Sequence, residues 1–273
     1  MNTTPQHYHL QKDHKVHRAT TPIPVAYHWK DEVNAALDAD VRKGILRKVP
    51  VGERTDWCMR MLVVPKHNGS PRRTVDFQPL NKYIDREIHH TPTPFQVVSS
   101  IPSKMYKTVL DAYNGYHQVP LDEESSKMTT FITEKGLYQY LRAPQGHVSS
   151  GDGYSHSYDD IVKDVERLKK ITDDVCLYDP DIEKQFYHTF DYLVLCSENG
   201  ITLNPSKFKF ARKELEFVGY NVGWDTYRPA DHMLSAIKNF PMPNEPSISD
   251  VRAWFGLVNQ IAPFVIKTDG AVS

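Results

Sequence analysis

The stretch Ile171-Thr172-Asp173-Asp174-Val175-Cys176-Leu177 puts two adjacent carboxylates at the tip of an apolar hairpin. An earlier apolar run, Thr108-Val109-Leu110, ends directly at a third carboxylate, Asp111. Carboxylates that meet in this way can hold two divalent metal ions, which stabilise the attacking and leaving oxygens of a phosphoryl transfer. Hard cations take oxygen ligands, so aspartate suits such a site. The alternative is a solvated turn, because an isolated Asp-Asp pair also suits hairpin loops.

Six short blocks set the acidic pair in a wider pattern. They are residues 72–81, 110–121, 143–146, 172–174, 203–207 and 217–219. Their order is that of the reverse-transcriptase sequence blocks, and the chain resembles the polymerase segment of gypsy-type LTR-retrotransposon polyproteins and, more distantly, retroviral reverse transcriptase. The resemblance extends over most of the chain, from Pro22 to Phe264. One block would be weak support, whereas six in order favour the metal-binding interpretation of the acids.

The resemblance implies an α+β fold of the reverse-transcriptase right-hand type, with fingers and palm, an antiparallel palm sheet backed by helices, and a short thumb-like C-terminal part. Residues 1–20 would form a flexible lead-in, residues 21–229 the fingers and palm, and residues 230–273 a partial thumb or connection segment. The implied function is RNA-directed DNA polymerase, which transfers deoxynucleotides to the 3′ end of a primer. The expected cofactor is a pair of Mg²⁺ ions, with Mn²⁺ as a substitute. The expected partners are dNTPs and an RNA or DNA template with its primer.

The resemblance also assigns roles to individual residues. Asp111, Asp173 and Asp174 match the metal-binding catalytic acids. Lys207 matches a lysine proposed in the family to protonate the leaving pyrophosphate. The residues matched to nucleotide binding are Lys66, Arg72, Tyr116, Gln145 and Gly146. The residues matched to the hairpin that holds the primer's 3′ end are Val218, Gly219 and Tyr220.

Each of these assignments has an ordinary structural alternative. Tyr116 would exclude a ribose 2′-hydroxyl by contact, but a tyrosine in a turn can equally be a core residue. Arg72 offers a planar guanidinium to a base and a phosphate, and Gly146 permits close backbone approach, but both suit an exposed loop as well. Lys66 and Lys207 could be surface lysines with solvated ammonium groups. The 217–220 turn could be a core hairpin.

Three positions depart from the family pattern. Ile171 stands where an aromatic residue usually precedes the acidic pair by two positions, and His147 stands where a large apolar or aromatic residue usually follows Gly146. Near the end, Ile261-Ala262-Pro263 replaces the usual aromatics and arginine. The sequence also stops without a ribonuclease H, integrase or protease segment. A second hypothesis is therefore a catalytically weak or domesticated fragment of a retroelement that binds nucleic acid or a protein partner.

Composition is that of a globular protein. The 273 residues are 40% hydrophobic and 25% charged, and the net charge is −1. Residues 1–110 carry 17 Lys and Arg against 10 Asp and Glu, whereas the remainder carries 16 against 24. A basic first part is compatible with nucleic-acid binding by the fingers, although a mixed solvated surface explains the asymmetry equally well.

The sequence also limits the compartment and the membrane partners that we expect. No apolar run approaches 18 residues and no signal-peptide core is visible. We therefore expect no membrane partner and an intracellular protein, cytoplasmic or nuclear. Cys58, Cys176 and Cys196 show no metal-ligand spacing and are expected to be reduced, buried thiols.

Hydrophobic periodicity predicts the elements that carry these blocks. It predicts helices over residues 31–43, 153–170, 182–199 and 249–264. It predicts strands over residues 59–65, 73–77, 108–110, 128–132, 138–141, 201–203 and 215–222. The polar segment 1–20 contains His7, His9, His14 and His17 at a spacing that fits no standard metal site, so it is expected to be disordered. Helices packed on one side of an antiparallel sheet would form the palm.

A second acidic pair must be separated from the first. Tyr158-Asp159-Asp160 is also an aromatic residue followed by two acids. It lies within a predicted helix, where both carboxylates would point away from a common site. We therefore expect Asp159 and Asp160 to lie on a solvated helix face.

Overall fold

The structure is a computed structural model that describes residues 1–264. The chain forms two compact units, and each unit is assembled from three separate stretches of sequence. Unit 1 contains Met1–His90, Ala112–Asp164 and Leu195–Thr202. Unit 2 contains Thr91–Asp111, Val165–Val194 and the described residues from Leu203 onward.

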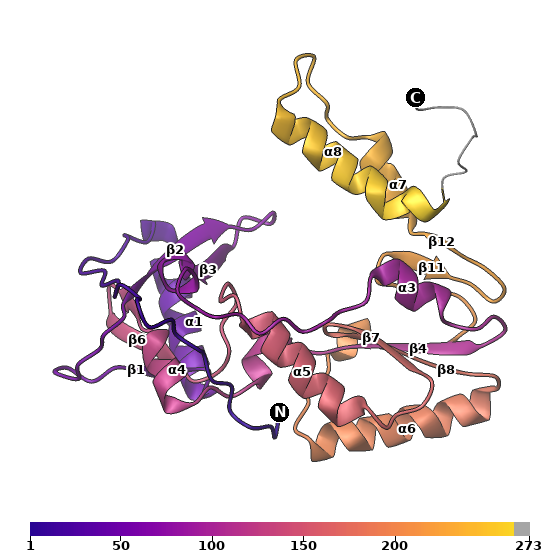
Figure 1. Ribbon diagram of the computed structural model, residues 1–273, viewed down its shortest axis with the longest axis horizontal. Helices are drawn as coiled ribbons and strands as arrows, with labels where there is room; N and C mark the ends of the chain where they lie inside the picture. The colour runs from indigo at the N-terminus through magenta and orange to yellow at the C-terminus, as the bar shows by residue number, and fades with distance from the viewer. Residues whose placement is uncertain (265–273) are drawn as a thin grey trace. The chain divides into compact units, whose positions relative to one another are not determined.

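Unit 1 is built around a five-stranded mixed sheet with strand order β1-β6-β5-β2-β3 (Figure 1). Its strands are β1 (Leu46–Lys48), β2 (Met59–Pro65), β3 (Pro71–Val75), β5 (Phe131–Thr133) and β6 (Gly136–Tyr140). Its helices are η1 (Tyr27–Trp29), α1 (Lys30–Arg42), α2 (Gln78–Asn81), η2 (Gly115–Gln118), α4 (Glu123–Met128) and α5 (Ser150–Val162). Neighbouring strands pair antiparallel except β2 and β5, which run parallel. The two hairpins that the sequence predicts, β2–β3 and β5–β6, are both present.

The first twenty residues are tied to unit 1 along their length. Isolated bridges pair Gln6 with Leu121, Leu10 with Ile84 and Arg18 with Cys58. The side chain of Tyr8 is fully buried. The segment therefore differs from the flexible lead-in that the sequence analysis expects, because backbone bonds and a buried ring hold it in place. The remaining boundaries, 21–229 and 230–273, stay predictions.

Unit 2 contains a four-stranded antiparallel sheet with strand order β7-β8-β4-β9 and a three-stranded sheet with order β10-β11-β12. The strands of the larger sheet are β4 (Tyr106–Asp111), β7 (Leu168–Ile171), β8 (Asp174–Asp179) and β9 (Lys209–Arg212). Those of the smaller sheet are β10 (Leu215–Phe217), β11 (Tyr220–Val222) and β12 (Tyr227–Pro229). Its helices are α3 (Pro94–Ser99), α6 (Ile182–Glu198, which continues into unit 1), η3 (Pro205–Lys207), α7 (Asp231–Lys238), α8 (Ile248–Ile261) and η4 (Ala262–Phe264).

The larger sheet of unit 2 is covered on both faces. Alternate residues of a strand point to opposite faces. Val109 belongs to an apolar cluster with residues of α3, β10 and β11, whereas its neighbour Thr108 bonds to Gln185 of α6 at 2.8 Å. Figure 1 shows α3 and α6 on opposite sides of β4 and β8. The sequence analysis expects helices on one side only, so the opposed faces are a difference from that expectation.

The predicted helices are present with one large difference in extent. The helix predicted over residues 153–170 ends at Val162, and residues 168–171 form β7 instead. Arg167 has a φ of 49°, which turns the chain between the two. The pairing of β7 with β8 then outweighs the helical pattern of the segment. The strand predicted over residues 201–203 is wrong, since that segment is irregular apart from one bridge residue.

Two further expectations concern the whole chain. The thiols of Cys58, Cys176 and Cys196 are reduced and buried, as the sequence predicts. Within residues 1–264, no helix combines the length and apolar character that a membrane crossing needs.

Candidate active site

The central strand β4 of unit 2 ends at Asp111, and its hydrogen-bonded neighbour β8 begins at Asp174. The register pairs these two residues directly. β4 is buried between two layers from Lys107 onward, and this burial leaves Asp111 only 5% exposed. Antiparallel pairing therefore brings two carboxylates that are far apart in sequence to one end of the sheet.

Asp173 lies in the two-residue turn that joins β7 to β8. Ile171 pairs with Asp174 on either side of this turn. Thr172, the first turn residue, has a φ of 51°. A β-branched residue rarely adopts this left-handed conformation, and strained backbone of this kind is concentrated at functional sites. The turn presents Asp173 next to Asp174 at the same end of β8.

Burial and mutual repulsion act on the two hairpin acids. Burial, followed by the charges of Asp111 and Asp173, raises the pKa of Asp174 to about 6. The pKa of Asp173 is also raised, chiefly by burial and then by the Asp111 charge. Carboxylates that repel one another in a partly buried site favour a proton or a cation as their neighbour. The cluster therefore carries an excess of negative charge that a bound cation would relieve.

Lys207 provides one positive charge to this cluster. The turn η3 carries it, and the Asn204 backbone N–H donates to the Asp111 carbonyl oxygen at 2.8 Å, which holds η3 at the end of β4. Lys207 Nζ donates to Asp111 Oδ2 at 2.6 Å. This hydrogen bond raises the pKa of the Lys207 ammonium. The structure thus brings together Asp111, Asp174 and Lys207, with Asp173 adjacent in the turn.

The donor set fits divalent cations in charge and in chemistry. Three carboxylates supply hard oxygen ligands, and one ammonium does not balance them. In the described part of the chain, no three His, Cys, Asp or Glu side chains already converge as a metal cage. Lys207 Nζ meanwhile forms an ion pair with one carboxylate oxygen of Asp111.

The residues predicted to bind the nucleotide all belong to unit 1. Arg72 is exposed on β3, opposite Val64 of β2. Lys66 is exposed at the start of the β2–β3 turn, which a bond from the Lys66 backbone N–H to the Ser70 carbonyl closes at 2.8 Å. Both cations therefore lie on one hairpin with solvated side chains.

Tyr116 lies in η2 and is half-buried. Its ring meets that of Tyr154 edge to face, with centroids 5.8 Å apart. A Cβ added to Gly151 of α5 would lie 3.5 Å from the Tyr116 hydroxyl oxygen. The ring is thus packed against α5 on one side. This position is compatible both with exclusion of a ribose 2′-hydroxyl and with an ordinary core residue in a turn.

Gln145 and Gly146 form an exposed loop beside the end of β3. Gly146 has a φ of 90°, which favours glycine. Asn81 spans this loop: its Nδ2 donates to the Gly146 carbonyl at 2.9 Å, and its Oδ1 accepts from the Val148 backbone N–H at 3.0 Å. The sequence analysis gives no role to Asn81, although it ends the first of the six blocks. Its place in that block is the signal that could have found it.

The predicted primer-holding hairpin joins β10 to β11. Val218 and Gly219 form its two-residue turn, and their φ values are 45° and 87°. A Cβ on Gly219 would lie 2.9 Å from Met233 Sδ. Tyr220, by contrast, is 3% exposed and donates its hydroxyl hydrogen to the Gln260 carbonyl at 3.0 Å. Tyr220 therefore supports the hairpin from within the core, and only Val218 and Gly219 lie at its tip.

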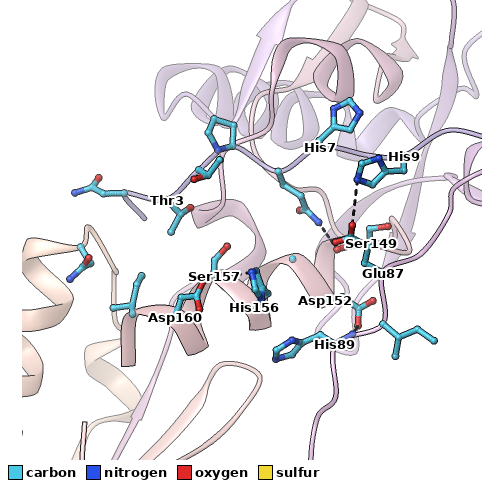
Figure 2. Close-up of a pocket in the computed structure, with 18 of the residues that line it drawn as sticks. Thr3, His7, His9, Glu87, His89, Ser149, Asp152, His156, Ser157 and Asp160 are labelled. Atoms are coloured by element: carbon cyan, nitrogen blue, oxygen red, sulfur yellow. Dashed lines mark hydrogen bonds and ion pairs between the residues drawn. The ribbon is translucent and has the colours of Figure 1, made fainter. Parts of the chain in front are cut away.

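The second acidic pair lies elsewhere, on α5 of unit 1. His89 Nε2 contacts Asp159 Oδ2 at 2.6 Å, and His156 Nε2 lies 3.6 Å from Asp160 Oδ2. Figure 2 shows His89, His156 and Asp160 around a cavity of about 780 Å³ that the N-terminal segment also lines. None of the predicted site residues lines this cavity. Asp159 and Asp160 are thus paired with histidines on a helix face of unit 1, whereas the predicted metal-binding acids belong to unit 2.

Comparison with known proteins bears on this arrangement. Residues 64–222, more than half of the chain, match the family model described as "Reverse transcriptase (RNA-dependent DNA polymerase)". The Tf2-3 transposon polyprotein of Schizosaccharomyces pombe is 24% identical over 240 residues, which cover 87% of this chain and 17% of that polyprotein. Polyprotein P3 of Commelina yellow mottle virus is 24% identical over 198 residues, which cover 72% of this chain and 10% of that polyprotein. The chain thus spans less than a fifth of the length of these curated relatives.

Solved structures share the fold. A foamy viral protease-reverse transcriptase in complex with double-stranded DNA matches with a TM-score of 0.81 at 19% identity, over 94% of this chain and 44% of that chain. The foamy viral protease-reverse transcriptase in complex with an RNA/DNA hybrid matches with a TM-score of 0.78 at 18% identity, over 93% of this chain and 35% of that chain. At this identity the match establishes the fold.

Proposed function

Since this chain belongs to the reverse transcriptase family and has its α+β right-hand fold, we propose that it catalyses RNA-directed DNA synthesis by adding deoxynucleotides to a primer 3′ end. The observation that carries the proposal is the cluster of Asp111, Asp173, Asp174 and Lys207 at one end of the larger sheet of unit 2. The order of sequence blocks and the 24% identity to a transposon polyprotein support an origin in a retrotransposon, which we assign to the gypsy type.

In this proposal Asp111 and Asp173 bind two Mg²⁺ ions, Asp174 supports them, and Mn²⁺ can substitute. When bound, the ions would supply Lewis-acid stabilisation of charge on the attacking and leaving oxygens. The excess negative charge of the cluster, with the pKa of Asp174 raised to about 6, supports this assignment. The register of β4 fixes the backbone of Asp111, and its carboxylate would exchange the Lys207 ammonium for a metal ion.

Lys207 is proposed to hold a proton at Nζ for the leaving pyrophosphate. Its pKa is raised by the hydrogen bond to Asp111, so the ammonium form is maintained. A positioned acid within reach of the leaving group speeds such a transfer. The same contact would keep the lysine aligned with the acids between turnovers.

Unit 1 would supply the contacts to the nucleotide. We assign the triphosphate to Lys66 and Arg72, which lie exposed on the β2–β3 hairpin. We assign the sugar to Tyr116 and the base pair to the Gln145-Gly146 loop, which Asn81 braces. Base stacking and phosphate contact both suit the planar guanidinium of Arg72.

The proposed partner is a template-primer duplex. The solved relatives are in complex with double-stranded DNA and with an RNA/DNA hybrid. For this chain we propose that the turn Val218-Gly219 contacts the primer backbone, because glycine permits close approach there. Other domains of an element polyprotein, such as ribonuclease H and integrase, would be further partners.

One observation favours a second candidate function. Lys207 already occupies Asp111, and no metal cage is preformed within residues 1–264. A catalytically weak or domesticated descendant that binds nucleic acid or protein would have this arrangement as its resting state. Primer extension on RNA and DNA templates, with dNTPs and Mg²⁺, separates the two. Incorporation no greater than that of Asp173→Asn would reject the polymerase and leave the binding module.

A further inference from the structure

Helix α6 has an inverted distribution of polar and apolar residues. Its inner face, which packs on the larger sheet of unit 2, carries Gln185 and Thr189, and both are buried. Its outer face carries six large apolar side chains that are between 40% and 58% exposed. We call this set the α6 stripe: Ile182, Phe186, Tyr187, Phe190, Leu193 and Val194. A surface helix normally places its apolar residues toward the core.

Specific bonds hold the polar inner face in place, while Gln185 Oε1 stays buried without a hydrogen-bond partner among the described residues. Gln185 Nε2 donates to Thr108 Oγ1 at 2.8 Å, and Thr189 Oγ1 donates to the Gln185 carbonyl at 2.7 Å. The third inner residue in this series, Tyr192, is buried as well. The orientation of the helix is therefore fixed by its inner contacts, and exposure of the stripe follows from it.

The stripe continues onto β9. Phe186 meets Phe210 edge to face at 6.3 Å, and Phe210 stacks with Phe208 at 6.3 Å. Phe208 is itself 42% exposed. The largest of these side chains have a surface area on the order of 150–250 Å² each. Because about half of the surface of each of the seven side chains is exposed, the apolar patch has an area of roughly 600 Å². A patch of this size marks an interface, and a stable interface buries about 800 Å² on each partner.

Most of the stripe is self-complementary along the helix. Four of its six residues are arranged symmetrically about position 188, since Ile182 and Val194 lie six residues to either side and Phe186 and Phe190 lie two, whereas Tyr187 and Leu193 fall opposite Thr189 and Glu183. Two copies of α6 that cross antiparallel at this position would pair Ile182 with Val194 and Phe186 with Phe190. A two-fold dimer interface needs this property, because the same surface serves both partners. His188 itself is turned inward, with Nδ1 2.6 Å from Asp179 Oδ2.

The charges beside the stripe match the same pairing. Lys184 and Asp191 lie seven residues apart on one flank of α6. In the antiparallel arrangement, Lys184 of one copy lies within one residue of Asp191 of the other, and the symmetry repeats this pair. Lys184 can reach the contact, since its side chain is 65% exposed and its ion pair with Asp181 is long, at 3.8 Å. Asp191 is exposed as well.

We propose that the α6 stripe is a homodimer interface, in which two copies of this chain pair their α6 helices antiparallel about a two-fold axis at His188. The self-complementary order of apolar residues and the matched charges favour a second copy over an unrelated partner. The proposal uses no catalytic residue and is independent of the proposed function, so the catalytically disabled Asp173→Asn variant should dimerise like the wild type.

The test is the mass of the chain in solution by sedimentation equilibrium over a wide concentration range. The wild type is expected to dimerise, and Phe190→Ala, changed on both copies, is expected to weaken the dimer by about a hundredfold or more. Phe255→Ala on α8 is the matched control, because Phe255 is 57% exposed and lies outside the stripe. Exposed substitutions of this kind should leave circular dichroism unchanged.

Charge reversal tests the orientation of the two helices. Lys184→Glu and Asp191→Lys should each weaken the dimer by about 3- to 10-fold, since each creates two like-charge pairs. The double variant Lys184→Glu/Asp191→Lys should restore the wild-type dissociation constant. A wild type that is monomeric at every concentration overturns the proposal, and so does a double variant no tighter than the single ones. If the isolated chain is monomeric and α6 becomes protected from hydrogen exchange only in a longer polyprotein, the stripe belongs to another segment of that polyprotein and the proposal fails.

Discussion

Tyr8 stacks face to face on His147, with ring centroids 3.6 Å apart and an angle of 15° between the planes. The Tyr8 hydroxyl lies 3.1 Å from Ser150 Oγ, and its backbone N–H donates to Ser125 Oγ at 2.8 Å. Burial lowers the pKa of His147 to about 3, so the imidazole in this stack is neutral at physiological pH. Through Tyr8, the N-terminal segment thus packs a buried ring against His147, the residue that follows the Gln145-Gly146 loop.

Loss of this ring should be costly. Tyr8→Ala is expected to lower the free energy of unfolding by about 3–5 kcal/mol, because it opens a cavity in the core. Tyr8→Phe keeps the stack and loses one hydrogen bond, so its free energy of unfolding is expected to fall by about 1 kcal/mol. Urea unfolding measures both changes. Tyr27→Ala is the control, since Tyr27 is 90% exposed. A Tyr8→Ala variant as stable as this control would show that the N-terminal segment is not anchored.

Removal of one hairpin acid should separate turnover from binding. Asp173→Asn is expected to abolish primer extension and to leave the affinity for template-primer within about threefold, because a ligand used in the transition state affects rate more than ground-state binding. Asp160→Asn, from the second acidic pair, should extend primers like the wild type. Filter binding and extension assays on the same preparations give the two quantities. Equal losses of binding and extension would assign Asp173 to folding or nucleic-acid contact.

The raised pKa of Asp174 predicts a pH-dependent stability. The folded state holds its proton up to about pH 6, whereas the unfolded state releases it near 3.8, the ordinary pKa of an aspartate. The contribution of this group to the free energy of unfolding therefore falls as the pH rises from about 4 to about 6. Without metal, Asp174→Asn should melt a few degrees above the wild type at pH 7 and close to it at pH 4.

Magnesium provides the complementary measurement for this acid. Added Mg²⁺ should raise the melting temperature of the wild type at pH 7 more than that of Asp174→Asn, since the ion relieves a repulsion that the variant lacks. Scanning calorimetry at both pH values, with and without Mg²⁺, measures each change. A variant that melts below the wild type at pH 7 in the absence of metal would contradict the destabilisation of ionised Asp174 by burial and by the neighbouring acids.

Selection of the sugar should depend on Tyr116. Tyr116→Val is expected to lower the ratio of dNTP to rNTP incorporation efficiency by about tenfold or more, because a ring excludes the 2′-hydroxyl by contact and each tenfold corresponds to about 1.4 kcal/mol. The matched control is Tyr113→Val, since Tyr113 lies three residues earlier and is 49% exposed. Competition assays with matched nucleotides measure the ratio. An unchanged ratio would make Tyr116 a packing residue against α5.

Gly219 should tolerate no larger residue. Gly219→Ala is expected to cost about 1–2 kcal/mol, because φ is 87° and the new Cβ would lie 2.9 Å from Met233 Sδ. Met233→Ala removes the contact and leaves the φ strain. The double variant should therefore lose less unfolding free energy than the sum of the losses of the two single variants. Thermal unfolding of the four proteins forms the cycle. Full additivity of the two changes would show that Met233 does not restrict this turn.

Long elements with a clear end were predictable from the sequence. Helices α1 and α6 begin and end within one residue of the predicted bounds, and Gly44 and Gly200 follow them with φ values of 65° and 63°. β7 was not predictable, because Val165 and Leu168 continue a helical pattern. The turn at Arg167 requires a positive φ that an arginine does not signal, and only pairing with β8 explains the strand.

The candidate site divides in the same way. Local patterns put Asp111 at the end of an apolar run and the Asp173-Asp174 pair at the tip of an apolar hairpin, and the resemblance to reverse transcriptases connected them. The bond from Lys207 to Asp111 joins residues 96 positions apart, and no local pattern encodes it. Asn81 and Tyr8 were missed for the same reason, since their partners lie 65 or more residues away. Sequence patterns report short-range structure, whereas these contacts depend on how the chain closes on itself.

The interleaving of the two units has a consequence for synthesis on the ribosome. Unit 1 is complete only when Thr202 has been made, and unit 2 draws on segments from before and after that point. At about 5–20 residues per second, roughly 10 to 40 s separate the synthesis of Met1 from that of Thr202. Neither unit can finish folding in this interval, and one edge of β4 stays unpaired until β9 has been made. A chain that ends before Thr202 therefore lacks a segment of each unit.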